Sequence, residues 1–504
     1  MHNPASSRNH ADIAFVVAVM TVAGALASFA IGRSLWHDEA LTAYFVDHDL
    51  AGLLAATRDD SSPPLYFLLL AAWTRALGSG EAALRLYSGL CYLATIPVLY
   101  WLGLVVTEER STARLAALLW AFSPFALMQS QNARMYTQVA LCGALTLVGF
   151  FLLLERGSTS WRAWSLYVLA NIAGSFTYYW WIFFALAQLI AWFVVYRSRH
   201  DRRFLLAYAA AVLPFALLGL PTLLYQTAHV GTTWVGRAGM TTWPARLLAT
   251  FLLYYGGGWF AGAVYAVGLA LVFAGARHGA RAFVIGGARL ALTLLISATL
   301  VVPLVVSRWK PLYKERFTIL ALVPLVVLAA VLLARFAPRR LVACAAAVLA
   351  VAVAARFVAE RRTEDAGSDK VSMTRLVAEA SPADVLVYTS LSRLSSEYYL
   401  KRLGAGDRFL RWSFPAETER HPGWRDVHAF LDRKAELDIE AAGLVAKLRA
   451  VQSERPRRIW FYYGSDLEVS EPLKRGLDAA FTPVATRDFR GSFYDRVLVY
   501  GAAR

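Results

Sequence analysis

Long apolar runs fill most of the first 357 residues of this chain, and short charged stretches separate them. A helix needs about 20 apolar residues to cross a bilayer, and a membrane-spanning backbone must satisfy its own hydrogen bonds. The composition agrees, because 58% of the 504 residues are hydrophobic and only 17% are charged, against about 25% charged residues in typical soluble domains. The sequence therefore predicts a polytopic α-helical membrane protein.

Eleven apolar segments are predicted to span the membrane. They are residues 12–32, 86–106, 115–130, 137–154, 163–177, 179–196, 204–225, 247–274, 290–307, 317–334 and 341–357. The first segment is too long for the apolar core of a secretory signal and is interpreted as an uncleaved span. Segment 63–77 is also apolar, but it opens with two prolines and carries Arg75. Its shorter length predicts an interfacial or re-entrant helix instead of a span.

The net charge of +16 is distributed as a topology signal and not as a nucleic-acid-binding surface. Arginines concentrate in loops 107–114, 155–162, 197–203, 275–289 and 335–340, which the positive-inside rule makes cytoplasmic. Loops 33–85, 131–136, 226–246 and 308–316 then face outward, together with everything after residue 358. The sequence thus predicts a multi-pass protein of the inner (plasma) membrane, in contact with membrane lipid, with a cytoplasmic N-terminus and no nucleic-acid partner.

The residues after 357 form a second predicted domain, because charged residues become frequent there. Three β-rich runs, 384–390, 458–465 and 496–501, alternate with helical patterns at 370–380, 394–404 and 424–450. This alternation predicts a small C-terminal α/β soluble domain over 358–504, extracytoplasmic by the topology above. It carries no phosphate loop, metal spacing or nucleophile elbow, so we expect it to cap the membrane domain (1–357) or to help bind an acceptor.

Acidic residues at both ends of the first outer loop are candidate catalytic groups. Asp38 and Glu39 lie in LWHDEA just after the first span, and Asp60 lies in DDSSPPLYF before segment 63–77. At a membrane interface the pKa of a carboxylate can shift until it acts as a base. A divalent metal held by Asp38 and Asp60 is equally compatible with the sequence. The alternative explanation is structural, since acids favour helix N-termini and turns.

Two further outer loops carry cations at the membrane surface. QSQNARMYT contains Arg134 and Tyr136, and SRWKPLYKERF contains Lys310, Lys314 and Arg316. An arginine at membrane depth is costly unless it faces a cavity or binds something. Cations on the side that the positive-inside rule disfavours suggest an anionic ligand such as a phosphate, although anchoring to lipid headgroups is the simpler alternative.

The order of these motifs, with EAALRLYSGL (81–90) between them, resembles bacterial GT-C-fold glycosyltransferases, the superfamily of protein O-mannosyltransferases and of the aminoarabinose transferase that modifies lipid A. The resemblance covers roughly residues 12–335. It implies transfer of a sugar from a polyprenyl-phosphate donor to a glycan, lipid or protein acceptor on the outer face. It also implies that Asp38 is, or positions, the base. The chain departs from the pattern at Ser62, where many relatives have histidine or lysine, and at Phe317, where tyrosine is usual.

Two other functions remain open from the sequence. A secondary transporter would show internal repeats and charges in mid-span, whereas here the charged motifs lie at span ends. A non-catalytic scaffold would use the C-terminal domain as its binding module. Convergence of Asp38, Asp60 and Arg316 on one outer cavity would favour a transferase, whereas a buried acid–base pair within a span would favour a transporter.

Overall fold

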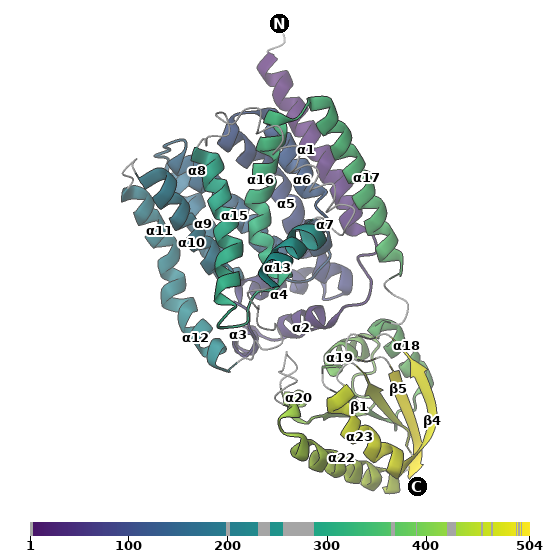
Figure 1. Ribbon diagram of the computed structural model, residues 1–504. Coiled ribbons are helices and arrows are strands. Elements are labelled where there is room, and N and C mark those ends of the chain that lie inside the picture. The colour runs from purple at the N-terminus through teal and green to yellow at the C-terminus, as the bar shows by residue number, and fades with distance from the viewer. Residues whose placement is uncertain are drawn as a thin grey trace.

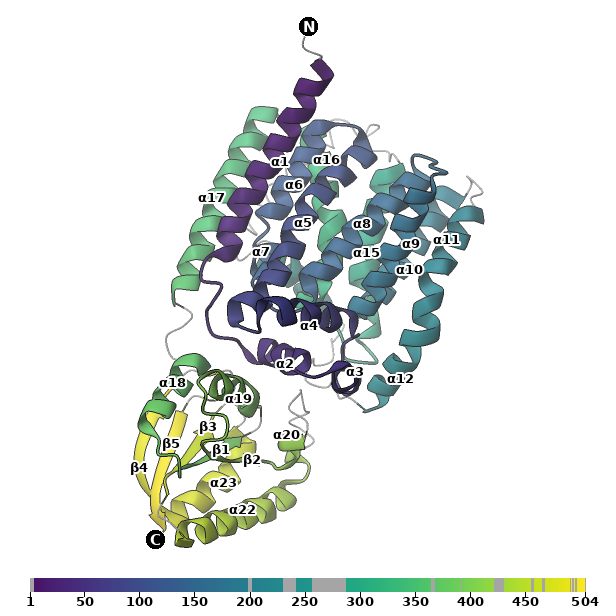
Figure 2. The same ribbon diagram turned by 180° about the vertical axis from the view of Figure 1, so that it is seen from behind.

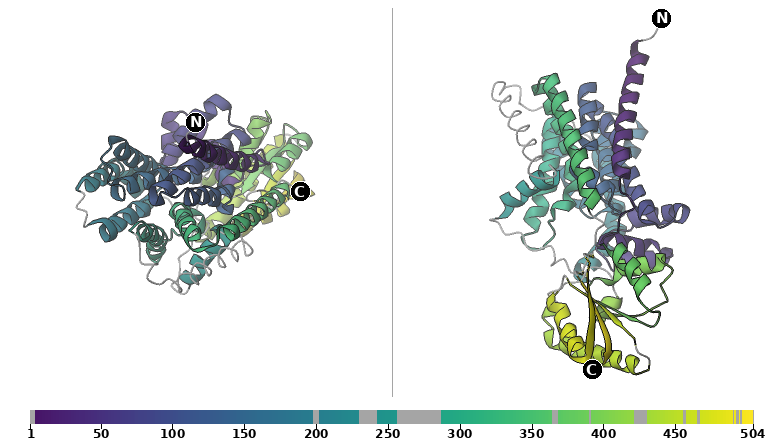
Figure 3. Two further views of the ribbon diagram at one scale, coloured as in Figure 1. Left: turned by 90° about the horizontal axis from the view of Figure 1, so that it is seen from above. Right: turned by 90° about the vertical axis from the view of Figure 1, so that its right-hand side faces the viewer.

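A computed structural model describes residues 4–197, 202–229, 242–255, 287–363, 368–389, 391–420, 430–454, 457–464, 467–489, 491, 494 and 496–503. A bundle of roughly parallel helices forms one part of the molecule, and a smaller domain built around a β-sheet adjoins one end of it (Figure 1). The N-terminal helix projects from the opposite end of the bundle (Figure 3). The fold class predicted from the sequence is confirmed.

Within the described residues, seven helices are long and apolar enough to cross a membrane, or eight if the bent pair α6 and α7 forms one span. The helices of the bundle are α1 (Pro4–Ser28), α5 (Glu81–Thr107), α6 (Arg110–Ala121), α7 (Pro124–Ser130), α8 (Tyr136–Leu154), α9 (Trp161–Thr177), α10 (Trp181–Ala191), α11 (Arg202–Pro214), α12 (Leu220–His229), α13 (Trp243–Ala249), α15 (Gly287–Val306), α16 (Ile319–Phe336) and α17 (Arg339–Thr363). The π-turns Trp192–Tyr196 and Phe215–Gly219 extend α10 and join α11 to α12.

The predicted spans correspond to these helices with two qualifications. Segment 163–177 coincides with α9, which has 17 residues, and segment 179–196 coincides with α10 and its π-turn, which together have 16 residues. Both are shorter than the roughly 20 residues that usually cross a bilayer. Most of the predicted span 247–274 and of loop 275–289 lies outside the described residues, as does the middle of loop 226–246.

Small residues allow neighbouring helices of the bundle to approach closely. A Cβ atom added to Gly103 of α5 would lie 2.6 Å from the Cα of Ala113 on α6. At Gly149 of α8, an added Cβ would lie 2.9 Å from the backbone of Tyr167 on α9. Such contacts are typical of membrane helix pairs, in which close backbone packing contributes much of the association energy.

Three helices of the first outer loop cover one end of the bundle: α2 (His37–Val46), α3 (Leu50–Arg58) and α4 (Leu65–Leu77). Helix α4 has 13 residues and lies across the ends of the long helices (Figure 2). The interfacial helix predicted from its length and its two prolines is therefore confirmed.

The C-terminal domain contains a five-stranded sheet in the order β2-β1-β3-β5-β4. Its strands are β1 (Val385–Thr389), β2 (Leu410–Phe414), β3 (Ile459–Tyr463), β4 (Phe481–Asp488) and β5 (Arg496–Ala503). Strands β1, β2 and β3 pair in parallel, while β5 pairs antiparallel with β3 and β4. The three predicted strands are confirmed, whereas β2 and β4 were not predicted, because their exposed positions give them a weak apolar pattern.

Helices cover both faces of this sheet. Val385 and Val387 of β1 pack with α22 (Lys434–Glu454) and α23 (Leu467–Ala480), whereas Leu386 and Tyr388 pack with α18 (Asp369–Glu379) and α19 (Arg393–Arg402). This alternation follows from the two-residue period of a strand. The short helix α20 (Glu417–Arg420) follows β2.

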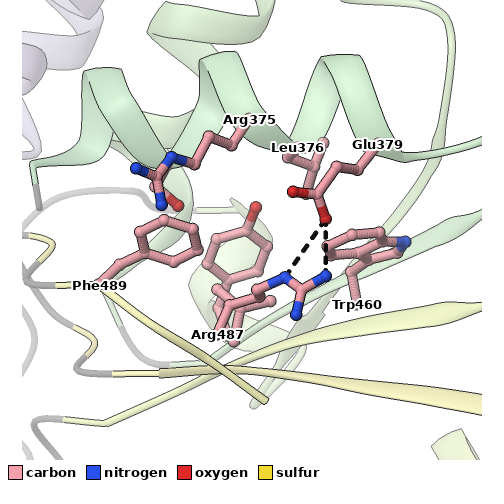
Figure 4. Close-up of a pocket in the computed structure, with 9 residues that line it drawn as sticks. Arg375, Leu376, Glu379, Trp460, Arg487 and Phe489 are labelled. Carbon is pink, nitrogen blue, oxygen red and sulfur yellow. Dashed lines mark hydrogen bonds and ion pairs between the residues drawn. The ribbon is translucent and has the colours of Figure 1, made fainter. Parts of the chain in front are cut away.

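A small hollow lies between α18 and the sheet (Figure 4). Glu379 of α18 accepts hydrogen bonds from Arg487 of β4, with a Nη2–Oε2 distance of 3.1 Å, and Arg375 lies 5.9 Å from the centre of the Phe489 ring. The hollow leaves no room for a water molecule. These residues therefore tie the sheet edge to α18 and do not form a ligand site.

The predicted boundary at residue 357 falls within α17, which continues to Thr363, and α18 begins at Asp369. Near the end of α17, Arg356 and Glu360 form an ion pair one helical turn apart, with a Nε–Oε1 distance of 2.7 Å. Such pairs stabilise a helix that extends beyond the lipid.

Candidate functional site

The first predicted catalytic residue, Asp38, lies in the first turn of α2 and is 1% exposed. Its Oδ2 atom lies 3.4 Å from Nη1 of Arg316, in the loop before α16. Nη1 of Arg134 lies 3.4 Å from the backbone carbonyl oxygen of Asp38. Residues from three outer loops thus converge on the start of α2, as expected from the topology.

The neighbouring acid, Glu39, occupies a different environment. It is fully buried and forms an ion pair with Arg85 of α5, whose Nε donates to Oε1 at 2.7 Å and whose Nη2 donates to Oε2. Glu39 also accepts hydrogen bonds from the backbone N–H groups of Ala133 and Trp36. Both carboxylate oxygens of Glu39 are thus bonded to protein groups, which suits a structural role. The catalytic role expected for Glu39 stays a prediction.

Arg85 also holds the chain between α1 and α2. Its guanidinium donates to the carbonyl oxygens of Ile31, Arg33 and Ser34 at 2.6–2.8 Å. From the loop before α8, the side chain of Gln131 donates to the carbonyls of Ala27 and Phe29. Backbone groups that leave solvent need such partners. The segment 27–36 that leads to Asp38 is therefore fixed by side chains that sequence reasoning did not single out.

The second predicted acid, Asp60, lies between α3 and α4 and is 4% exposed. Its Oδ2 atom has no hydrogen-bond partner among the residues that the structure describes. Burial raises the pKa of this carboxyl; Asp38 raises it further, and Arg134 opposes both effects. Because these charges interact, Asp38, Asp60 and Arg134 belong to one electrostatic cluster.

Aromatic rings surround Arg316. Its guanidinium carbon lies 5.5 Å from the centres of both the Trp36 and Phe317 rings, within the range of cation–π attraction. Phe317 contacts Tyr178 and Trp180 edge to face, at centroid distances of 6.1 and 5.7 Å. The rings thus surround the Arg316 guanidinium beside Asp38 with apolar surface.

Arg134 and Tyr136, the predicted residues of the second loop, are both buried. Besides the Asp38 carbonyl, Nη1 of Arg134 lies 3.4 Å from Oγ1 of Thr42. Tyr136 contacts Tyr178 edge to face at 5.9 Å. Both residues are thus placed within the cluster.

The two predicted lysines differ in position from Arg316. Nζ of Lys310 donates to the carbonyl oxygen of Thr227 on α12, at 3.1 Å. Lys314 precedes the short 3₁₀ turn Glu315–Thr318 that carries Arg316. Of the three predicted cations in this loop, the structure places Arg316 in contact with Asp38.

His37 is a buried neighbour of Asp38 that the sequence analysis did not select. Burial lowers the pKa of its imidazole to about 4, against the opposing influence of Asp38. The ring is therefore neutral at physiological pH, and it does not offset the charge of Asp38. Its place directly before Asp38 in LWHDEA is the sequence feature that could have identified it as a neighbour of the candidate base.

The described residues do not fit a metal site made by the protein alone. Among them, no group of three or more His, Cys, Asp or Glu side chains is placed to hold an ion. Asp38 and Asp60 would supply two carboxylates, and the charge of each already interacts with a guanidinium. We therefore derive no step through a metal.

Comparison with known proteins supports the fold. Residues 61–225 match the family profile described as dolichyl-phosphate-mannose-protein mannosyltransferase. No curated protein sequence matches the chain. Among solved structures, ArnT from Cupriavidus metallidurans in the apo state matches with a TM-score of 0.63 and 14% identity, over 97% of each chain. The same protein bound to undecaprenyl phosphate gives the same score and coverage with 13% identity.

A more distant structure is the oligosaccharyltransferase AglB from Archaeoglobus fulgidus, in complex with an inhibitory peptide and a dolichol-phosphate. It matches 93% of this chain and 72% of its own, with 12% identity and a TM-score of 0.51. At these identities the similarity establishes the fold. The fold that the motif resemblance implied is thereby confirmed.

Proposed function

We propose that this chain is a membrane glycosyltransferase that transfers a sugar from a polyprenyl-phosphate-linked donor to an acceptor hydroxyl, with Asp38 as the base. The observation that carries the proposal is the buried Asp38 carboxylate facing Arg316 at the end of the bundle covered by α2, α3 and α4. The solved structures with this fold include complexes with undecaprenyl phosphate and with a dolichol-phosphate. A lipid phosphate is accordingly the donor class that we assign.

On the acceptor side, Asp38 removes the proton of the acceptor hydroxyl as its oxygen attacks the anomeric carbon. The bond between that carbon and the phosphate oxygen breaks, and the lipid phosphate leaves with the bonding pair. A positioned base contributes about 10²–10⁴-fold to such a step. The inward position of Asp38 in the first turn of α2 suits this role better than that of Glu39, whose oxygens are already bonded.

On the donor side, Arg316 offsets the charge that the leaving phosphate acquires. Preorganised cations in a site with little water stabilise such charge more than they would in bulk solvent. Arg134 is the second cation of the cluster. Lys310 and Lys314, in the same loop as Arg316, add further positive charge that attracts the phosphate of the donor. Tyr136 and the rings around Arg316 line the donor site.

Asp60 completes the proposal as a binding group for the sugar. Its buried Oδ2 atom has no hydrogen-bond partner among the residues that the structure describes. Buried polar groups left in this state carry a free-energy cost that a ligand can remove. A sugar hydroxyl supplies the donor that this atom lacks.

The site end of the bundle faces outward in this proposal. At the other end, Arg110 and Arg114 pair with Asp12, and Arg156 pairs with Glu108. These arginines belong to the arginine-rich loops 107–114 and 155–162, which the positive-inside rule assigns to the cytoplasmic side. The charged cluster at one end of the bundle also favours a transferase over a transporter with a mid-membrane site.

The test is an assay of donor consumption. Purified protein is incubated with a set of radiolabelled polyprenyl-phosphate sugars, including mannosyl and aminoarabinosyl donors, and a cell-envelope fraction as the source of acceptors. We expect release of polyprenyl phosphate from one donor class, coupled to label in an acceptor. No turnover with any lipid-phosphate donor by well-folded protein would overturn the proposal.

A further inference from the structure

The C-terminal domain contacts the membrane domain through α18 and α19. These helices lie between the sheet and α2 (Figures 1 and 2). Glu81 of α5 lies 3.1 Å from Nζ of Lys370 and 3.8 Å from Nε of Arg402. Leu394 of α19 is buried in the hydrophobic cluster of the membrane domain. The contact therefore combines ion pairs with apolar burial.

One contact of this interface reaches the chain that carries Asp38. The backbone N–H of Leu35 donates to the hydroxyl oxygen of Tyr399 in α19, at 2.7 Å. Leu35 is 1% exposed and Tyr399 is 2% exposed. The amide would therefore lose its hydrogen bond without gaining one from bulk water if the hydroxyl were removed.

Other contacts hold the same segment from both domains. From the C-terminal domain, the backbone N–H of Lys370 donates to Oγ of Ser34 at 3.3 Å, and its Nζ donates to the carbonyl oxygen of Gly32 at 3.0 Å. Arg85 holds the carbonyls on either side of Gly32, and Gln131 holds those nearer α1. Among these contacts from the C-terminal domain, the bond from the Leu35 amide to Tyr399 lies nearest in sequence to α2.

We propose that Tyr399 is a positioning residue, through which the C-terminal domain fixes the segment before α2 and thereby the orientation of the Asp38 carboxylate. The proposal rests on the assignment of Asp38 as the base, and it gives the C-terminal domain a part in positioning that base. Two residues separate Leu35 from Asp38, and a small displacement of a reacting group lowers the rate steeply. Tyr399 contacts the backbone and not the substrate, so its effect is exerted through Asp38.

The chain supplies a matched control for this interaction. Tyr398 is the preceding residue of α19, and its hydroxyl donates to the carbonyl oxygen of Ser79 in the loop before α5, at 3.0 Å. Both tyrosines bridge the domains, but Tyr398 does not bond to the segment before α2. Tyr398→Phe and Tyr399→Phe each remove one tyrosine hydroxyl from the interface; that of Tyr399 accepts from the Leu35 amide and also interacts with Ser34 of the same segment.

The first measurement is steady-state transfer by the full-length protein. Tyr399→Phe is expected to lower kcat about 10-fold, the scale of one lost buried hydrogen bond, while the donor KM stays within about twofold of wild type. Tyr398→Phe is expected to retain wild-type kcat. Equal losses in the two variants, or a Tyr399→Phe enzyme with wild-type kcat, would overturn the positioning role.

The second measurement does not depend on activity. Hydrogen exchange of the Leu35 amide is expected to accelerate at least about 10-fold in Tyr399→Phe and to stay unchanged in Tyr398→Phe. An amide exchanges when the structure around it opens locally, and the hydrogen bond to Tyr399 opposes this opening at Leu35. Unchanged exchange in Tyr399→Phe would refute the contact itself. Faster exchange in a protein that transfers no sugar with any donor would instead locate the failure in the proposed function.

Discussion

The buried ion pair between Arg85 and Glu39 leads to a quantitative prediction about stability. Both side chains have zero exposure, and the guanidinium also serves three backbone carbonyls. Arg85→Met removes the cation while keeping most of the volume, which leaves a buried carboxylate without its counter-ion. Breaking one partner of a buried pair costs about 3–5 kcal/mol. The carbonyls that lose their donor add to this cost.

Glu39→Gln is expected to be milder. The glutamine keeps the shape of the side chain and its oxygen, and Arg85 retains the three carbonyls. We expect a loss of about 1–3 kcal/mol. The double variant Arg85→Met with Glu39→Met removes both charges, and it is expected to be more stable than Arg85→Met alone.

The assay is thermal unfolding of detergent-purified protein, followed by intrinsic fluorescence and by the monodisperse fraction that survives heating. The expected order of stability is wild type, then Glu39→Gln, then the double variant, then Arg85→Met. An Arg85→Met protein as stable as wild type would refute the structural role of the pair. A Glu39→Gln protein with wild-type stability and no transfer would return Glu39 to the catalytic group.

Three further predictions concern the site. Arg316→Ala should weaken donor binding by about 1.5–3 kcal/mol through loss of a charge-assisted contact, measured as donor affinity, and unchanged affinity would exclude Arg316 from the phosphate site. Asp60→Asn should raise the unfolding temperature at pH 7. The folded-state pKa of Asp60 is raised, so the ionised carboxylate destabilises the fold as pH rises through that pKa. The increase in unfolding temperature should therefore shrink towards acidic pH. Asp59→Asn, at an exposed neighbour, is the control, and a destabilised Asp60→Asn protein would contradict the reasoning. A divalent cation held by Asp38 and Asp60 together with the donor phosphate would make transfer sensitive to EDTA, because Mg²⁺ can be bound by one or two protein carboxylates and substrate phosphates; activity that is lost with EDTA and restored by added cation would show such a site, and unchanged transfer would exclude it.

Much of this arrangement was predictable from the sequence because the physical signals are local. The length of an apolar run identifies a span, and two prolines before 13 helical residues identified α4 as a surface helix. The cations of the predicted outward loop 308–316, on the side that the positive-inside rule disfavours, indicated Arg316. The structure places this residue beside Asp38. Motif order and charge position therefore carried the prediction of the site.

What the sequence did not show depends on contacts between distant segments. Glu39 and Asp38 have equivalent local signals, and only the approach of Arg85 from α5 separates a structural acid from a candidate base. Tyr399 lies in an ordinary helical pattern of a different domain, 364 residues from the amide that it binds. Such pairings arise from tertiary packing, which local patterns do not encode.

The most direct test of the central claim is turnover by Asp38→Asn. The substitution keeps the size of the side chain but removes its basicity, so transfer should fall by roughly 10²-fold or more while donor affinity changes little. Asp47→Asn is the control, since Asp47 is an exposed acid at the other end of α2 that pairs with Lys401, and it should retain transfer. With extraction yield and thermal stability matched to wild type, a large loss confined to Asp38→Asn is the result that the account predicts. Near-wild-type turnover by a folded Asp38→Asn protein would contradict it.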